Sequence, residues 1–151
     1  MKVKLSPDFK VWMVWEASQL ADRMAATQSQ SSRGPNDDES DEGRGGDTSQ
    51  LRNLIQITQK ESEVPVLRNY IEYQTARDAT RNFWEPVYED VIKALEEIAE
   101  KCESEATGDE VERRRFALQS FFEYMVRRYV FQTKIGDRAT QGARGGGGGL
   151  S

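Results

Sequence analysis

The stretch YEDVIKALEEIAEKC, residues 88–102, decides the fold class of this chain. Its apolar side chains alternate spacings of three and four residues, at Tyr88, Val91, Leu95, Ile98 and Cys102. Side chains at these spacings share one face of an α-helix, which has about 3.6 residues per turn. The stretch therefore predicts a helix that packs against other helices, with Pro86 in its first turn.

Four further helices are predicted on either side of this one. The first covers residues 8–26, and its apolar face consists of Phe9, Trp12, Met13, Leu20 and Met24. The second begins near an N-cap at Asp47 or Thr48 and turns Leu51, Leu54, Ile55 and Thr58 inward. The third begins at Pro65 and continues to about Phe83. The last runs from about Val111 to Lys134, with Leu118, Phe122, Met125 and Tyr129 facing inward.

The remaining segments are polar. Residues 28–46 form an acidic, low-complexity stretch without apolar residues, for which we expect a disordered linker. Residues 104–110, SEATGDE, predict a turn, and residues 136–151 predict a flexible, glycine-rich tail. We find no strand pattern. The sequence thus predicts an all-α fold, a compact bundle of about five helices, with an N-terminal amphipathic helix over 1–27 and a helical core over 47–135.

Composition limits the class of protein. A chain of 151 residues forms one domain at most, and Cys102, the single cysteine, has no partner for an internal disulfide. No apolar run reaches the roughly 18–20 residues of a membrane span, and no signal-peptide pattern is present. We expect a soluble, cytoplasmic protein with no membrane partner.

Catalysis is not expected. The chain contains no histidine, which removes the commonest general base and metal ligand. The acids around the central helix, at Glu89, Glu96, Glu97, Glu100 and Glu103, have the spacing of a solvated face. We therefore predict no catalytic residue, no metal site and no cofactor, and Cys102 is expected to be a small core residue.

Charge is distributed unevenly along a chain whose net charge is −5. From Glu85 to Glu112 there are eleven acids against two lysines, and from Arg113 to Arg144 there are eight basic residues against two acids. Arg113, Arg127 and Lys134 are spaced by multiples of seven, and Arg114 and Arg128 repeat that spacing alongside. Such a stripe can neutralise successive phosphates of a nucleic acid. The alternative is a solvated face that opposes the acidic helix.

Three arginines also occur close together in VLRNYIEYQTARDATRNFW, residues 66–84. In a continuous helix Arg77 and Arg81 lie one turn apart on one face, whereas Arg68 lies nearly opposite. One interpretation is phosphate binding by Arg77 and Arg81. The other pairs Arg77 or Arg81 with Glu72, Asp78 or Glu85 in surface salt bridges, which stabilise little.

The order of these segments resembles a known family. TSQLRNLI, then VLRNYIEYQTARD, then an acidic amphipathic helix, then FFEYMVRRYVFQTK together resemble the small subunit of type III-A CRISPR effector (Csm) complexes, over residues 47–135. The family implies a non-catalytic helical subunit, stacked in several copies, that contacts guide RNA and target RNA beside the backbone and large subunits. Arg52, Arg68 and Arg77 match family positions; Arg81, Arg127, Arg128 and Lys134 come from the charge pattern.

The competing hypothesis is a helical adaptor that binds only protein. Such an adaptor would self-associate by placing the acidic face of one copy against the basic face of another. Trp12 and Trp15, on adjoining faces of the first helix, would offer it additional aromatic surface.

Overall fold

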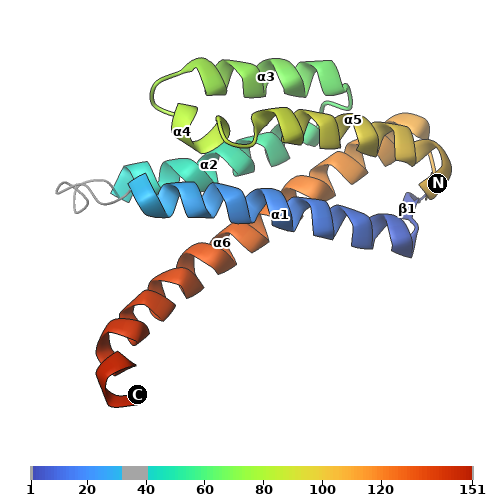
Figure 1. Cartoon of the computed structure of the whole chain (residues 1–151). Coiled ribbons are helices and arrows are strands. Elements are labelled where there is room, and N and C mark those ends of the chain that lie inside the picture. Colours follow the sequence, from blue (N-terminus) through green and yellow to red (C-terminus); the bar gives the residue numbers. More distant parts are fainter. Residues whose placement is uncertain (1, 32–40, 151) are drawn as a thin grey trace.

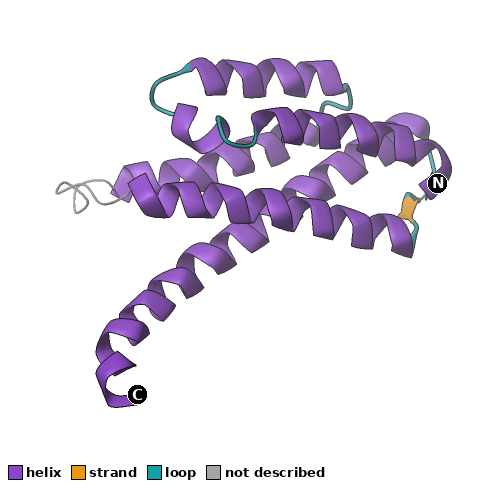
Figure 2. Ribbon diagram, viewed as in Figure 1, coloured by secondary structure: helices purple, strands orange, loops and turns teal. Residues whose placement is uncertain are grey.

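The computed structural model describes residues 2–31 and 41–150, with side chains over residues 2–28 and 48–135. In chain order the elements are β1 (Lys4–Leu5), α1 (Pro7–Ser31), α2 (Asp41–Thr58), α3 (Val64–Ala76), α4 (Arg81–Trp84), α5 (Tyr88–Glu105), β2 (Ala106–Thr107) and α6 (Glu110–Leu150). Figures 1 and 2 show a helical bundle, with one very short strand pair near the N-terminus. The all-α prediction is confirmed, with six helices in the described ranges.

The longest packed surface is formed by α6, which contacts α1, α2 and α5. Its inward side chains include Leu118, Phe122, Met125 and Tyr129, all of which are buried as predicted. On α1, Phe9, Met13, Leu20 and Met24 are buried as well, whereas Trp12 is half-buried. The inward faces that periodicity predicts for both helices are therefore confirmed.

The central helix α5 buries Val91, Leu95, Ile98 and Cys102, which confirms the predicted seam. Its start differs slightly, because Val87 occupies the N-cap position and Pro86 precedes the helix. On α2, Leu51, Leu54 and Thr58 are buried as expected. The predicted cap at Asp47 or Thr48 was wrong, since α2 begins at Asp41. The apolar pattern marks the buried part of α2 among the described side chains, and the helical backbone starts earlier.

The predicted third helix is divided in two, so the expected continuous helix from Pro65 to Phe83 was wrong. The backbone of Arg77 is extended (ψ 137°) and ends α3. The Thr80 hydroxyl donates to the Gln74 carbonyl oxygen at 2.5 Å, which holds the turn that leads to α4. Threonine and aspartate commonly form such local hydrogen bonds in place of helical ones.

Burial of two aromatic rings explains the break. In a straight helix Phe83 would point about 160° away from Leu67, towards solvent. The turn instead places Phe83 and Trp84 in the core, at 2% and 0% exposure. The Trp84 indole Nε1 donates to Gln50 Oε1 on α2 at 3.2 Å, and the Phe83 ring meets the Tyr129 ring edge-on. Tertiary packing has therefore overridden the local helical pattern.

A two-residue antiparallel pairing joins the N-terminus to the α5–α6 turn, where we had expected no strand. Lys4 pairs with Thr107 and Leu5 with Ala106. Ser6 Oγ accepts from the Phe9 N–H at 3.1 Å and donates to Glu105 Oε1 at 2.7 Å, capping α1. Gly108, in the predicted turn, has φ +113°, and a Cβ there would lie 3.1 Å from Val3 Cα.

Two predicted segments fall largely beyond what is described. Residues 32–40 of the expected linker, and all side chains from 29 to 47, lie outside the described residues. At the C-terminal end α6 extends to Leu150, beyond the expected helix end near Lys134. The side chains of the expected tail, residues 136–151, also lie outside the described part.

Adjacent residues on α3 provide a test of this packing. Leu67 is fully buried, whereas Val66 is 46% exposed. Leu67→Ala should lower the free energy of unfolding by about 2–5 kcal/mol, because it leaves a cavity in the core. Val66→Ala should change it by less than about 0.5 kcal/mol. Chemical denaturation followed by circular dichroism measures both, and equal effects would contradict the assigned orientation of α3.

Candidate nucleic-acid interface

The seven basic residues expected to contact RNA are spread over several elements. Arg52 lies exposed on α2, Arg68 on α3, Arg77 at the end of α3, and Arg81 at the start of α4. Arg127, Arg128 and Lys134 lie on α6, whose C-terminal part projects away from the bundle in Figure 1. The candidates therefore form one compact group on α6 and a second, more dispersed set.

Two candidates on α3 and α4 have nearby carboxylate partners. Arg68 Nε donates to Glu72 Oε2 at 2.9 Å, and this contact raises the arginine pKa above its ordinary value. Arg81 pairs with Asp78 at 2.7 Å. The Arg81–Asp78 pair is one that the salt-bridge interpretation predicted, whereas the Arg68–Glu72 pair was not predicted. Solvent-exposed pairs of this kind stabilise little, so a phosphate can replace the carboxylate at little cost.

Arg77 has a different environment, and it does not share a helical face with Arg81, contrary to our expectation. The helix ends between them, so one arginine terminates α3 and the other begins α4. Arg77 Nη1 donates to Gln74 Oε1 at 3.1 Å, and its guanidinium lies 5.8 Å from the centre of the Tyr73 ring. Among the described side chains Arg77 has no carboxylate partner.

Arg128 forms the principal charged contact between α1 and α6. Its Nε and Nη2 donate to the two carboxylate oxygens of Asp22 at 2.8 and 3.2 Å, and Gln132 Nε2 donates to Oδ1 at 2.9 Å. The Arg128 hydrogen bond, partly opposed by desolvation, holds the pKa of Asp22 below its ordinary value of 3.8. The same contact raises the pKa of Arg128. Arg128 therefore has a structural role, which sequence spacing had not indicated.

The other two candidates on α6 are less constrained. The Arg127 guanidinium lies 5.8 Å from the centre of the Tyr124 ring, and Lys134 is exposed. Neither has a carboxylate partner among the side chains of residues 2–28 and 48–135. Phe131, which the charge pattern did not single out, lies on this surface with half of its area exposed and Arg128 5.5 Å from its ring centre. Phe131 lies four residues after Arg127 and three before Lys134, so its place on this surface could have been predicted from that spacing.

The basic residues at the start of α6 serve the fold, so the expected stripe does not extend to Arg113. Arg113 Nη1 donates to the Gly108 carbonyl oxygen at 3.1 Å. Arg114 bonds to the Ser62 carbonyl oxygen and to Glu63, both at 2.9 Å, and Arg115 pairs with Glu112 at 2.5 Å. Arg113 and Arg114 thus tie α6 to the two loops at that end of the bundle, whereas the Arg115–Glu112 pair lies within α6.

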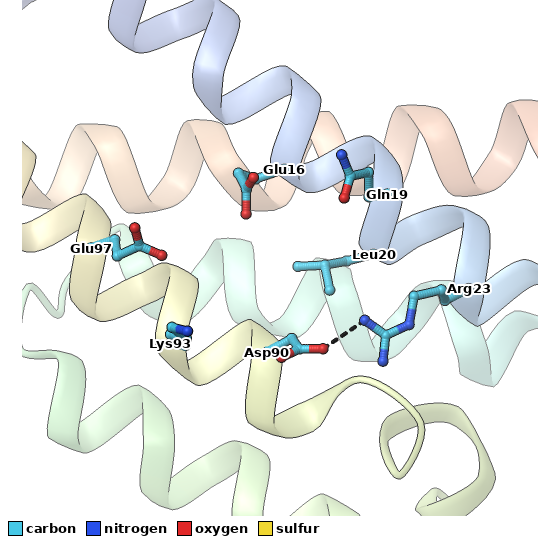
Figure 3. Close-up of a pocket in the computed structure, with 7 residues that line it drawn as sticks. All are labelled: Glu16, Gln19, Leu20, Arg23, Asp90, Lys93 and Glu97. Carbon is cyan, nitrogen blue, oxygen red and sulfur yellow. Dashed lines mark hydrogen bonds and ion pairs between the residues drawn. The ribbon is translucent and has the colours of Figure 1, made fainter.

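A shallow groove of about 180 Å³ lies between α1 and α5, and Figure 3 shows its lining. Arg23 spans it, bonding to Asp90 at 2.6 Å and to the Pro86 carbonyl oxygen. The remaining lining residues are Glu16, Gln19, Leu20, Lys93 and Glu97. Charges of both signs therefore line the groove. Within the described side chains, no three His, Cys, Asp or Glu residues are placed to hold a metal ion.

Cys102 is buried on the apolar seam of α5. Burial raises the pKa of its thiol to about 11, despite the nearby Arg113 and Arg114. The group is therefore a neutral thiol at physiological pH, as a core residue should be.

Comparison with known proteins gives no further assignment. No protein-family model, no curated protein and no solved structure matches the chain. Separately, none of the described helices is long and apolar enough to cross a membrane.

The Asp22–Arg128 contact predicts a pH-dependent contribution to stability. Asp22→Asn should lower the free energy of unfolding at pH 7 by about 0.5–1 kcal/mol, the range for a solvent-screened pair. Because the folded-state pKa is depressed, this contribution is present above the ordinary value of 3.8 and lost as pH falls below it. The difference between wild type and variant should therefore shrink in acid.

Denaturation between pH 3 and 7 measures this difference. Asp78→Asn, which breaks an exposed local pair with Arg81, is the control and should have a smaller effect. A wild-type–variant difference that stays constant with pH would show that the carboxylate of Asp22 is not the group involved.

Proposed function

We propose that this chain is a non-catalytic small subunit of a type III CRISPR RNA-guided effector complex. The order of TSQLRNLI, VLRNYIEYQTARD and FFEYMVRRYVFQTK supports the proposal, as does the helical bundle that these segments build. Its partners in that role are guide RNA, target RNA, the backbone and large subunits, and further copies of itself. The place of action is the cytoplasm.

The observation that most directly supports RNA contact is the cationic surface on the projecting part of α6. Arg127 and Lys134 lack carboxylate partners among the described side chains, and each carries a charge free for phosphates. Arg77 and the exposed Arg52 offer further charges on α3 and α2. To bind RNA, Arg68 and Arg81 would each exchange a solvent-exposed carboxylate for a phosphate. Arg128 would have to release Asp22, and with it the contact that joins α1 to α6.

Contacts of this type position RNA without reading its sequence. Lysine and arginine bound to phosphates set the register of a nucleic acid, whereas base edges carry the sequence information. A complex whose specificity comes from base pairing with a changeable guide requires protein contacts of the first kind. Several weakly binding copies along one RNA would together give high affinity.

Removal of two such contacts tests the proposal. In the assembled complex, Arg77→Ala with Arg127→Ala should weaken target binding by roughly 5–30-fold for each copy that contacts the RNA, at about 0.5–1 kcal/mol for each contact. The loss should be similar for unrelated guides. The slope of log affinity against log salt should flatten by about one unit for each lost phosphate contact.

Arg115→Ala is the matched control on α6, because Arg115 is already paired with Glu112. It should leave both the affinity and the salt slope nearly unchanged. If the double variant binds target normally but fails to assemble with its neighbours, these arginines contact protein and the adaptor hypothesis is favoured.

An exposed apolar patch on α1 favours the second candidate function, a helical adaptor that binds protein. On α1, Val11 and Trp15 are 69% and 65% exposed, and Val14 beside them is also exposed. Trp12 does not belong to this patch, because it stacks on Phe9 and lies beneath Lys101 of α5. An apolar surface of this kind suits a protein contact better than RNA, and a second copy of the chain is the partner proposed.

Sedimentation of the purified chain over a range of concentrations tests self-association. Trp15→Ser should weaken it by about 30-fold if the indole is a central contact. Tyr73→Ser, which alters an equally exposed aromatic residue on α3, should not change it. A wild-type chain that remains monomeric at high concentration would rule out the α1 patch as a strong self-contact.

A further inference from the structure

The outward surface of α6 alternates aromatic and basic side chains. Tyr124, Arg127, Phe131 and Lys134 follow one another at spacings of three, four and three residues, which places them on one side of the helix. They are distinct from the inward positions of the same segment, Phe121, Phe122, Met125 and Tyr129. We call these four residues the α6 stripe; Tyr124 is partly buried against the core, whereas Arg127, Phe131 and Lys134 are exposed.

The rings of the α6 stripe contact guanidinium groups. Arg127 lies 5.8 Å from the centre of the Tyr124 ring, and Arg128 lies 5.5 Å from that of Phe131. Two hydrogen bonds to Asp22 hold Arg128 in turn. Phe131 thus rests against an anchored cation while half of its surface stays exposed. Its position is fixed before any ligand binds, which lowers the entropic cost of binding there.

The chemistry of the α6 stripe matches a single-stranded nucleic acid. Flat aromatic faces stack on unpaired bases of any sequence, while neighbouring cations follow the phosphates. From Arg127 to Lys134 the helix rises about 10.5 Å, at about 1.5 Å per residue. A strand stacked as in a duplex, at about 3.4 Å per nucleotide, would cover that length with roughly three nucleotides. The spacing therefore suits one or two stacked bases between phosphate contacts.

A protein partner explains the α6 stripe less well. Aromatic residues and arginine are common in protein interfaces as well, but lysine is depleted there, and the stripe ends on Lys134. Asp22 is bound by Arg128, and Glu123, one turn before Arg127, accepts a hydrogen bond from Gln119. Neither Arg127 nor Lys134 forms an ion pair with an acid among the described side chains.

We propose that the α6 stripe is a stacking platform for unpaired nucleobases, with Phe131 as its principal ring. The proposal rests on the RNA-binding function above and adds a contact to bases that phosphate binding does not require. It implies a preference for single-stranded over duplex RNA, because paired bases do not expose their faces. The contact remains independent of sequence, since every base has such a face.

Two labelled probes of 20 nucleotides separate stacking from charge. One is oligouridine and the other is oligo-dihydrouridine, which carries the same phosphates on a non-planar, non-aromatic base. Fluorescence anisotropy with the full chain at low salt should show about tenfold tighter binding of oligouridine. Equal binding of both probes would overturn the platform and leave phosphate binding intact. Binding of neither probe, at chain concentrations up to about 1 mM, would overturn both the platform and RNA binding by this chain.

Substitutions at Phe131 assign the preference to its ring. Phe131→Leu keeps an apolar side chain but removes the aromatic face, so the oligouridine preference should fall to about one, with the salt slope unchanged. Phe131→Tyr should retain the preference. Ile135→Ala is the control, since Ile135 is an exposed apolar residue on the same end of α6.

Each variant should melt at the wild-type temperature, because the altered side chains are exposed. A full preference in Phe131→Leu would contradict the assignment of Phe131 as the stacking residue. An equal loss in Phe131→Leu and Ile135→Ala would show a general apolar surface in place of a stacking platform, and would also overturn the proposal.

Discussion

The buried apolar face of α6 is the contact on which the rest of the structure depends. Leu118, Phe121, Phe122 and Met125 are fully buried, and α1, α2 and α5 pack against the helix that carries them. Each fully buried side chain of this size contributes roughly 1.5–3 kcal/mol through the hydrophobic effect. Because α6 is contacted by three other helices, its orientation determines which of its side chains remain available to a partner.

This constraint divides α6 along its length. At its start, Arg113, Arg114 and Arg115 are used to hold loops and a neighbouring acid, so they contribute to folding. Farther along, Asp22 and Arg128 join α6 to α1, and the C-terminal part of α6 projects from the bundle (Figure 1). Arg127, next to Arg128, and Lys134, farther along, have no carboxylate partner among the described side chains and are free to meet phosphates. The proposed RNA-binding surface thus lies beside the internal contacts of α6.

Much of this arrangement was predictable because it follows local periodicity. The inward faces of α1, α5 and α6 were identified from spacings of three and four residues, as was the buried position of Cys102. The break after Ala76 was not, because neither glycine nor proline interrupts residues 66–84. It depends on Phe83 and Trp84 reaching a core that other helices build. Burial by distant elements leaves no local trace in a single sequence.

In the candidate site, too, local contacts could be predicted from the sequence and long-range contacts could not. The local pair Arg81–Asp78 was anticipated, because its members are three residues apart. The Arg128–Asp22 contact joins residues 106 positions apart, so charge spacing alone misassigned Arg128 as a free cation. Phe131 was not predicted, because the pattern of charged residues does not include the aromatic residues between the cations. Long-range pairing therefore decides which members of a basic stripe remain available.

The central claim, that this chain acts within an RNA-guided complex, is tested most directly by isolating it from its native cells. A tagged chain, purified with its neighbours at moderate salt, would be examined by protein mass spectrometry and RNA sequencing. The account predicts a multi-subunit assembly that carries short processed RNA of a narrow length range. Recovery of protein partners without any such RNA would contradict it.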